Sequence, residues 1–296
     1  MNTQFGLRTE NFKNKNYLNG RVKLVTNKKY GIEFKFGERT IGNQVGFTER
    51  YELDDEGYVS QITYLDSLGK EVERYEFGYD NNNNLKERLE YDRGELIEKI
   101  KYDYDSIGNR TKSYLSFIPT SSQSQTDYLY DESNKVVVVN FLDSKGNLIQ
   151  RDKYSYQFED DKNQVIKSIY HSNGELNSEK YFEFDNRGNL TVEYSLDKLE
   201  NVPFSKRSNR VEKLFSTNGL VMITTESGFS GMNYTQETIY HYDSINNIIR
   251  EEITRFKEND TIFVPPIEFE YVYDDENNWV QKSNSSFIEI REIEYH

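Results

Sequence analysis

Apolar and polar residues alternate with a period of two between short polar turns. After one such turn, Leu190, Val192 and Tyr194 fall on one side of an extended chain. Thr191 and Glu193 fall on the other side. This alternation is typical of antiparallel strands with one covered and one solvated face. Because no stretch fits a 3.6-residue period better, the pattern predicts a nearly all-β chain.

A motif of two aromatic or leucine positions followed by aspartate punctuates these segments. Its aspartates are Asp54, Asp80, Asp105, Asp131, Asp160, Asp185, Asp243 and Asp274. The first six recur at intervals of about 25 residues, which is the signature of an internal structural repeat. A second, shorter turn falls between most copies, as at Asp66, Asp92 and Asp143. Each repeat is therefore predicted to contain two turns and two strands.

Turn chemistry explains the residues at these positions. An aspartate side chain accepts hydrogen bonds from the backbone two residues on, and glycine or asparagine tolerates the positive φ that closes the turn. The predicted positive-φ glycines are Gly57, Gly69, Gly108, Gly146 and Gly188. The asparagines predicted to replace glycine are Asn83 or Asn84, Asn134, Asn163, Asn247 and Asn278.

The fold class that follows is all-β, with antiparallel β-hairpin repeats of about 25 residues in one extended, curved or wrapped sheet. We expect an N-terminal β cap over residues 1–50 and regular repeats over 51–197. Degenerate repeats and a C-terminal cap would occupy 198–296, in a single continuous domain. Irregular loops interrupt the repeat. Loops of this kind can bind partners, and they also tolerate changes in sequence.

The composition of the chain argues against several classes of ligand and location. The chain has 24 Tyr, 18 Phe and no Cys, and its net charge is −14. Such a charge repels nucleic acid and anionic lipid, so we expect neither as a ligand. No apolar run approaches the ~20 residues of a membrane helix, so we expect no membrane insertion. The polar N-terminus predicts a cytoplasmic protein, or a periplasmic or surface protein if a native signal has been removed.

Two segments carry a resemblance to a known family. Tyr-Asp-Ser-Ile-Gly-Asn-Arg-Thr at 104–111 and Phe-Asp-Asn-Arg-Gly-Asn-Leu-Thr at 184–191 resemble the YD repeat of Rhs-type bacterial toxins and teneurins. The segment 170–176 resembles the MORN-type repeats of antitoxin-like β-repeat proteins. Asn278-Trp279, followed by 291–295, is similar to YD-like proteins of Bacteroidetes-type bacteria. The resemblance implies β-hairpins joined edge to edge, without catalytic residues in the repeats.

Candidate chemistry is sparse. The three histidines, His171, His241 and His296, are not at metal-ligand spacing. The run from Asp80 to Asn84 lacks the glycine and glutamate of a calcium loop. Paired carboxylates such as Asp54-Asp55 lie on predicted turns. We therefore expect no enzyme, no catalytic or metal-binding residue and no cofactor.

Aromatic pairs recur along the repeat, at Tyr102/Tyr104, Tyr128/Tyr130, Tyr154/Tyr156 and Phe182/Phe184. They are expected to form the covered face, because cross-strand aromatic pairs stabilise sheets. Exposed rows would instead bind sugars or peptide.

The function expected from these features is a non-catalytic protein-binding module. In its sharpest form it is an immunity or antitoxin-like protein that masks a basic bacterial toxin domain. One alternative is an exported module that binds carbohydrate or the cell surface. Another is a structural assembly subunit that self-associates through sheet edges, which uncapped terminal strands would favour.

Overall fold

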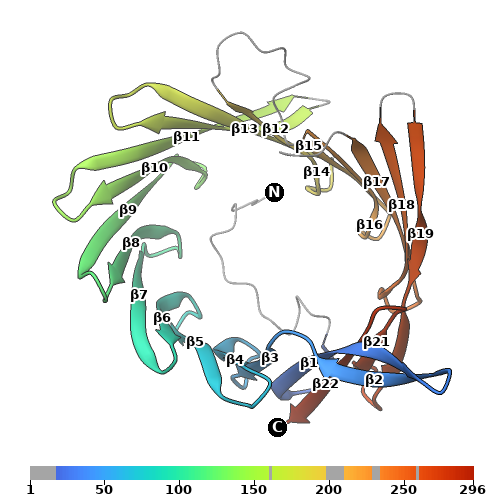
Figure 1. Cartoon of the computed structure of the whole chain (residues 1–296). Coiled ribbons are helices and arrows are strands. Elements are labelled where there is room, and N and C mark those ends of the chain that lie inside the picture. Colours follow the sequence, from blue (N-terminus) through green and yellow to red (C-terminus); the bar gives the residue numbers. More distant parts are fainter. Residues whose placement is uncertain (1–17, 160–161, 198–209, 229–233, 258–259) are drawn as a thin grey trace. The chain divides into compact units, whose positions relative to one another are not determined.

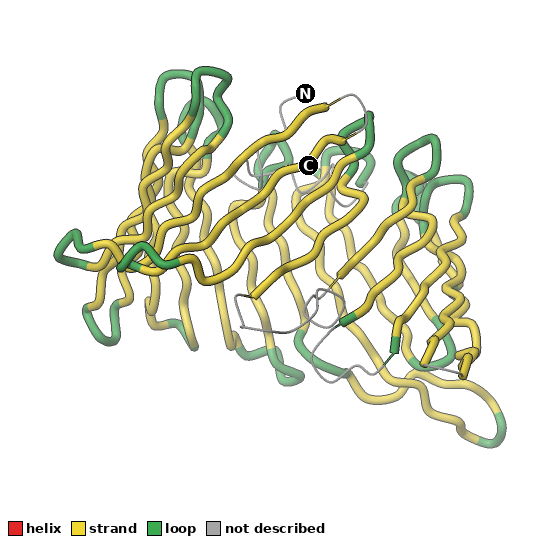
Figure 2. The backbone as a smooth tube through the Cα atoms, turned by 90° about the horizontal axis from the view of Figure 1, so that it is seen from above, coloured by secondary structure: helices red, strands yellow, loops and turns green. Residues whose placement is uncertain are grey.

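The computed structural model describes residues 18–159, 162–197, 210–228, 234–257 and 260–296. These residues form 22 antiparallel strands and no helix. Figure 2 draws the strands in yellow. The predicted all-β, antiparallel fold class is therefore confirmed. Within the described residues, no helix is long and apolar enough to cross a membrane.

The chain divides into two compact units. Unit 1 holds the described residues of 126–268, and unit 2 holds those of 18–125 and 269–296. The boundary falls within β9 (Ser122–Tyr130). The proposed division into an N-terminal cap, regular repeats and a degenerate C-terminal part stays a prediction.

Unit 1 is a meander in which each strand pairs with the next. Its strands are β10 (Val136–Asp143), β11 (Leu148–Glu159), β12 (Lys162–His171), β13 (Leu176–Phe184), β14 (Leu190–Asp197), β15 (Arg210–Phe215), β16 (Val221–Ser227), β17 (Thr235–Tyr242), β18 (Ile248–Lys257) and β19 (Asp260–Glu268). The pairing of β14 with β15 is short, with only Val192 opposite Glu212 and Glu193 opposite Val211.

Unit 2 is organised around its first strand. Its strands are β1 (Val22–Lys35), β2 (Glu38–Gln44), β3 (Thr48–Leu53), β4 (Val59–Leu65), β5 (Glu71–Tyr79), β6 (Leu85–Asp92), β7 (Glu95–Tyr104), β8 (Arg110–Phe117), β20 (Glu270–Tyr273), β21 (Trp279–Ser283) and β22 (Phe287–Tyr295). β1 pairs with β22 on one edge and with both β3 and β2 on the other. The first and last strands of the chain thus lie side by side, blue against red in Figure 1. Neither is an uncapped edge.

Little of the described chain is fully buried. The contiguous core cluster lies in unit 2 and comprises Leu18, Val22, Val25 and Leu53, with Tyr51 and Ile293 packed against it. In most strands the side chains of both faces are only half-buried. Hydrogen bonds between neighbouring hairpins therefore contribute more to the specificity of this fold than they would in a protein with a thick hydrophobic core.

A tyrosine hydroxyl links successive repeats. Tyr79 donates to the carbonyl oxygen of Val59 (2.8 Å) and Tyr104 to that of Leu85 (2.7 Å). Tyr156 donates to Val136 (2.8 Å) and Tyr242 to Val221 (2.7 Å). Tyr79, Tyr104 and Tyr242 are the last residues of their strands, whereas Tyr156 lies three residues before the end of β11. Each acceptor is the first residue of a strand about 20 residues earlier. In three of the four links the donor is the tyrosine directly before a turn aspartate, and its hydroxyl attaches that hairpin to the preceding one.

Candidate functional site

Seven of the eight predicted turn aspartates lie at the first position of a tight turn, and Asp160 lies outside the described residues. The seven are Asp54, Asp80, Asp105, Asp131, Asp185, Asp243 and Asp274. In each turn the aspartate N–H donates to the carbonyl oxygen four residues on. At Asp105, Oδ1 accepts the backbone N–H groups of Ile107 (3.0 Å) and Asn109 (2.8 Å). These carboxylates are therefore committed to holding turns.

An asparagine four residues after the aspartate adds a further bond in several turns. Asn147 Nδ2 donates to Asp143 Oδ2 (2.9 Å) and Asn189 Nδ2 to Asp185 Oδ2 (2.8 Å). The bond from Asn147 is the main cause that lowers the pKa of Asp143. At Asp185, burial alone would raise the pKa, but the hydrogen bonds from Asn189 and Arg187 outweigh it and the pKa is lowered.

The position of positive φ needs a correction. It lies three residues after the aspartate, at Asn83, Asn134, Asn246 and Asn277, when glycine is absent. Asn247 and Asn278, which were predicted there, lie one residue later because their backbone N–H groups bind the aspartate carboxylate. Asn163 lies in β12, opposite Phe184, and not in a turn.

The aromatic ladder is half-buried in the described strands. Tyr104 and Tyr156 use their hydroxyl groups for the links between repeats. Burial raises the pKa of Tyr156 to about 12. The pairs are thus part of the folded framework, and the surfaces that remain open lie elsewhere.

One open surface is the outer end of the β1–β2 hairpin, residues 32–41, which we call the aromatic hairpin. Beyond Gly31, β1 has lost its pairing with β22 and pairs only with β2. The side chains of Phe34 and Ile41 are 72% and 50% exposed. Phe36, at the tip, is 107% exposed. A two-stranded ribbon is marginally stable alone, and exposed apolar clusters commonly mark interaction sites.

The tip of the aromatic hairpin has an unusual backbone. Phe36 and Gly37 form its two-residue loop, with φ of 55° and 86°. Such loops favour asparagine and glycine, because a bulky residue is strained at positive φ. Arg39, opposite Phe34 and close to the tip, tethers the hairpin, because its Nη2 donates to the carbonyl oxygen of Asn284. The sequence therefore displays an aromatic ring at a position where the fold prefers asparagine.

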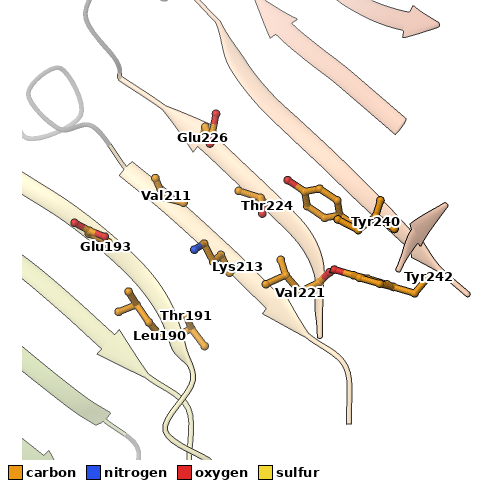
Figure 3. A pocket seen from close by; sticks show the side chains of 11 residues that line it. Leu190, Thr191, Glu193, Val211, Lys213, Val221, Thr224, Glu226, Tyr240 and Tyr242 are labelled. Atoms are coloured by element: carbon orange, nitrogen blue, oxygen red, sulfur yellow. The ribbon is translucent and has the colours of Figure 1, made fainter. Parts of the chain in front are cut away.

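A second open surface is a groove of about 490 Å³ in unit 1, which we call the unit 1 groove. It lies over β14 to β18, beside the short β14–β15 pairing (Figure 3). Glu193, Lys213 and Glu226 supply charged groups of both signs, and Tyr240 supplies an aromatic ring. The arrangement offers hydrogen-bond donors and acceptors beside an apolar surface.

Sequence reasoning missed both surfaces. A signal for the hairpin was present, since Phe36-Gly37 places glycine after an aromatic residue between two alternating segments. The groove had no such signal, because it depends on how β14 and β15 diverge. No group of three or more His, Asp or Glu side chains in the described part of the chain could hold a metal ion.

Comparisons with known proteins give only weak similarities. No protein-family model and no curated protein matches the sequence. A porin-like protein from Bacteroides uniformis has 9% identity and a TM-score of 0.34, over 92% of this chain and 96% of that chain. The Photorhabdus luminescens Tc holotoxin pore has 12% identity and a TM-score of 0.23, over 81% of this chain. A TcdB2–TccC3 structure has 10% identity and a TM-score of 0.24, over 88% of this chain.

This chain spans 16% and 18% of the two Tc chains. All three TM-scores are low, so these neighbours assign no function. The relation to the YD and MORN repeat families stays a prediction.

Proposed function

We propose that this chain is a non-catalytic β-repeat module that binds another protein through the aromatic hairpin. The observation that carries the proposal is Phe36, which is fully exposed and held at positive φ. A residue in a sparsely populated backbone region costs about 1–3 kcal/mol, and such strain concentrates at functional positions. An aromatic side chain kept there at that cost is suited to enter a pocket on a partner.

The chemistry of the hairpin end fits an anchor for a protein interface. Aromatic residues dominate the binding energy of interfaces when they enter well-packed pockets. Phe34 and Phe36 supply two such side chains. The charged residues around them, Glu33, Lys35, Glu38 and Arg39, balance in sign. The hairpin end therefore supplies apolar contact without a net charge of its own.

The partner we propose is a basic protein and, in the sharper form of the proposal, a toxin domain that this chain masks. The net charge of −14 supports this, because complementary fields raise association rates. The first 50 residues are net basic, so the rest of the chain carries more than the whole negative charge. Steering by that acidic remainder and anchoring by the hairpin are separate contributions.

The test uses a matched pair of turn variants. Phe36→Asn gives the loop its preferred residue and removes the anchor. Arg93→Asn makes the same backbone change in the β6–β7 loop, where Arg93 and Gly94 have φ of 49° and 87°. We expect both variants to unfold at equal or higher temperature than the parent, since asparagine relieves strain.

The partner is captured from the native host with the tagged parent chain, identified by mass spectrometry and titrated calorimetrically. Phe36→Asn should weaken its binding at least tenfold, whereas Arg93→Asn should leave the affinity unchanged. Equal affinities of parent and Phe36→Asn would refute the hairpin as the anchor. The masking role requires in addition that cells expressing the captured protein grow only when this chain is co-expressed.

A further inference from the structure

The unit 1 groove contains charged groups of both signs that do not pair with one another. Glu193, Lys213 and Glu226 line the groove, and each is half-buried. None of the three has an ion pair or side-chain hydrogen bond with another described residue. By contrast, Lys167 in the same unit binds the carboxylate of Asp152 at 2.7 Å. The same groove thus holds hydrogen-bond donors and acceptors that are not used within the described residues.

Strand register separates the two glutamates. Glu193 on β14 lies opposite Val211 on β15, and Val211 lies opposite Glu226 on β16. Two strand spacings therefore separate the glutamates, about 10 Å between their backbones. Lys213 lies on the same face of β15 as Val211 and opposite Thr224. The valine between the glutamates leaves an open floor with charge on both sides.

An aromatic wall completes the groove. Figure 3 shows the ring of Tyr240 with its flat face toward the viewer, while the ring of Tyr242 is seen edge-on beside Val221. The hydroxyl of Tyr242 is bound to the carbonyl oxygen of Val221, which fixes that ring. Tyr240 thus presents a ring surface to the groove. A ring face of this kind packs against apolar C–H groups or cations.

We propose that the unit 1 groove is a binding site for a neutral saccharide. A purely cationic ligand would meet Lys213, and a purely anionic one would meet Glu193 and Glu226. Sugar hydroxyls donate to carboxylates and accept from ammonium groups, so a neutral polyhydroxylated ligand uses all three residues. The C–H face of a pyranose packs on Tyr240. The volume of about 490 Å³ is within the range of ligand sites.

This site is independent of the proposed protein partner, because the groove and the aromatic hairpin lie in different units. Loss of either activity leaves the other to be measured. The full chain is therefore screened against an array of neutral oligosaccharides, and the best binder is titrated calorimetrically. The same titration uses a lysine-rich peptide and free amino acids as cationic and zwitterionic probes.

Two variants test the groove, Lys213→Met and Glu226→Gln, with Glu212→Gln as the control. Glu212 lies on β15 next to Lys213 but on the opposite face, where it pairs with Arg210 at 2.6 Å. Circular dichroism confirms that each variant is folded. Both groove variants should weaken saccharide binding about tenfold, because each removes hydrogen bonds to a charged group. Glu212→Gln should not change it.

Affinity for the neutral saccharide should also be independent of salt, because the ligand carries no charge. Three outcomes would overturn the proposal. The array could show no binding. The lysine-rich peptide could bind instead, more tightly in Lys213→Met and more weakly in salt. Free amino acids could bind in preference to sugars, which would mean that the charged groups of the groove recognise a zwitterionic ligand.

Discussion

At the residue scale, the repeat depends on side chains that satisfy backbone groups. The turn aspartate accepts two N–H groups of its own turn, and the tyrosine before it donates to a carbonyl of the preceding repeat. An unsatisfied backbone group is costly wherever water is excluded. The Tyr-Asp pair therefore specifies both the bend of a hairpin and its attachment to its neighbour.

Removal of one tyrosine hydroxyl should have a defined cost. Tyr156→Phe keeps the ring but leaves the carbonyl oxygen of Val136 without its donor. The free energy of unfolding should fall by about 1 kcal/mol, the usual net value of such a bond. Tyr170→Phe is the control, because its half-buried ring has no hydroxyl hydrogen bond among the described residues. Equal urea midpoints for the two variants would contradict this role of the hydroxyl.

Acid sensitivity should follow from the turn carboxylates. The pKa of Asp185 is lower in the folded chain than its ordinary value, chiefly because hydrogen bonds from Asn189 outweigh the effect of burial. Its contribution to stability is thus present above the ordinary pKa and is lost as pH falls through the folded pKa. Asn189→Ala should lower stability at pH 7 but much less at pH 2, as measured by urea unfolding. An equal loss at both pH values would show that the carboxylate is not involved.

At the element scale, the pairing of β1 with β22 holds unit 2 together. β1 would otherwise leave residues 22–31 as an open edge over part of the hydrophobic cluster. The sequence could not reveal this pairing, because partners such as Val25 and Ile293 stand at opposite ends of the chain. Turn positions were predictable because their signals are local. Strand partners beyond the next hairpin have no local signal.

Truncation of the last strand tests that role. Deleting residues 286–296 removes β22 and exposes the edge of β1, so unit 2 should lose stability. Hydrogen exchange should show faster exchange in β1 and β3, while β11 to β13 of unit 1 keep their protection. Deleting His296 alone, which removes one backbone bond to Arg21, is the control. Unchanged exchange in β1 would mean that β22 does not support it.

At the scale of the whole molecule, the regular repeats form the sheet, and the segments that depart from the repeat form the two candidate binding surfaces. The aromatic hairpin lies in the predicted N-terminal cap, before the first motif aspartate. The unit 1 groove lies where β15 meets β14 at only two residue pairs. Both surfaces lie where the repeat of about 25 residues is interrupted. A prediction based on that repeat therefore identifies the sheet but neither of the two surfaces.

The tyrosine link also limits how the length of this protein can change. Donor and acceptor belong to successive repeats, about 20 residues apart. An insertion or deletion of a few residues between them would misplace that hydroxyl relative to its carbonyl. Excision of residues 80–104, in contrast, joins Tyr79 directly to Asp105 and restores the same Tyr-Asp step. Such a chain is expected to grow and shrink in whole hairpin units during evolution, and engineers can lengthen it the same way.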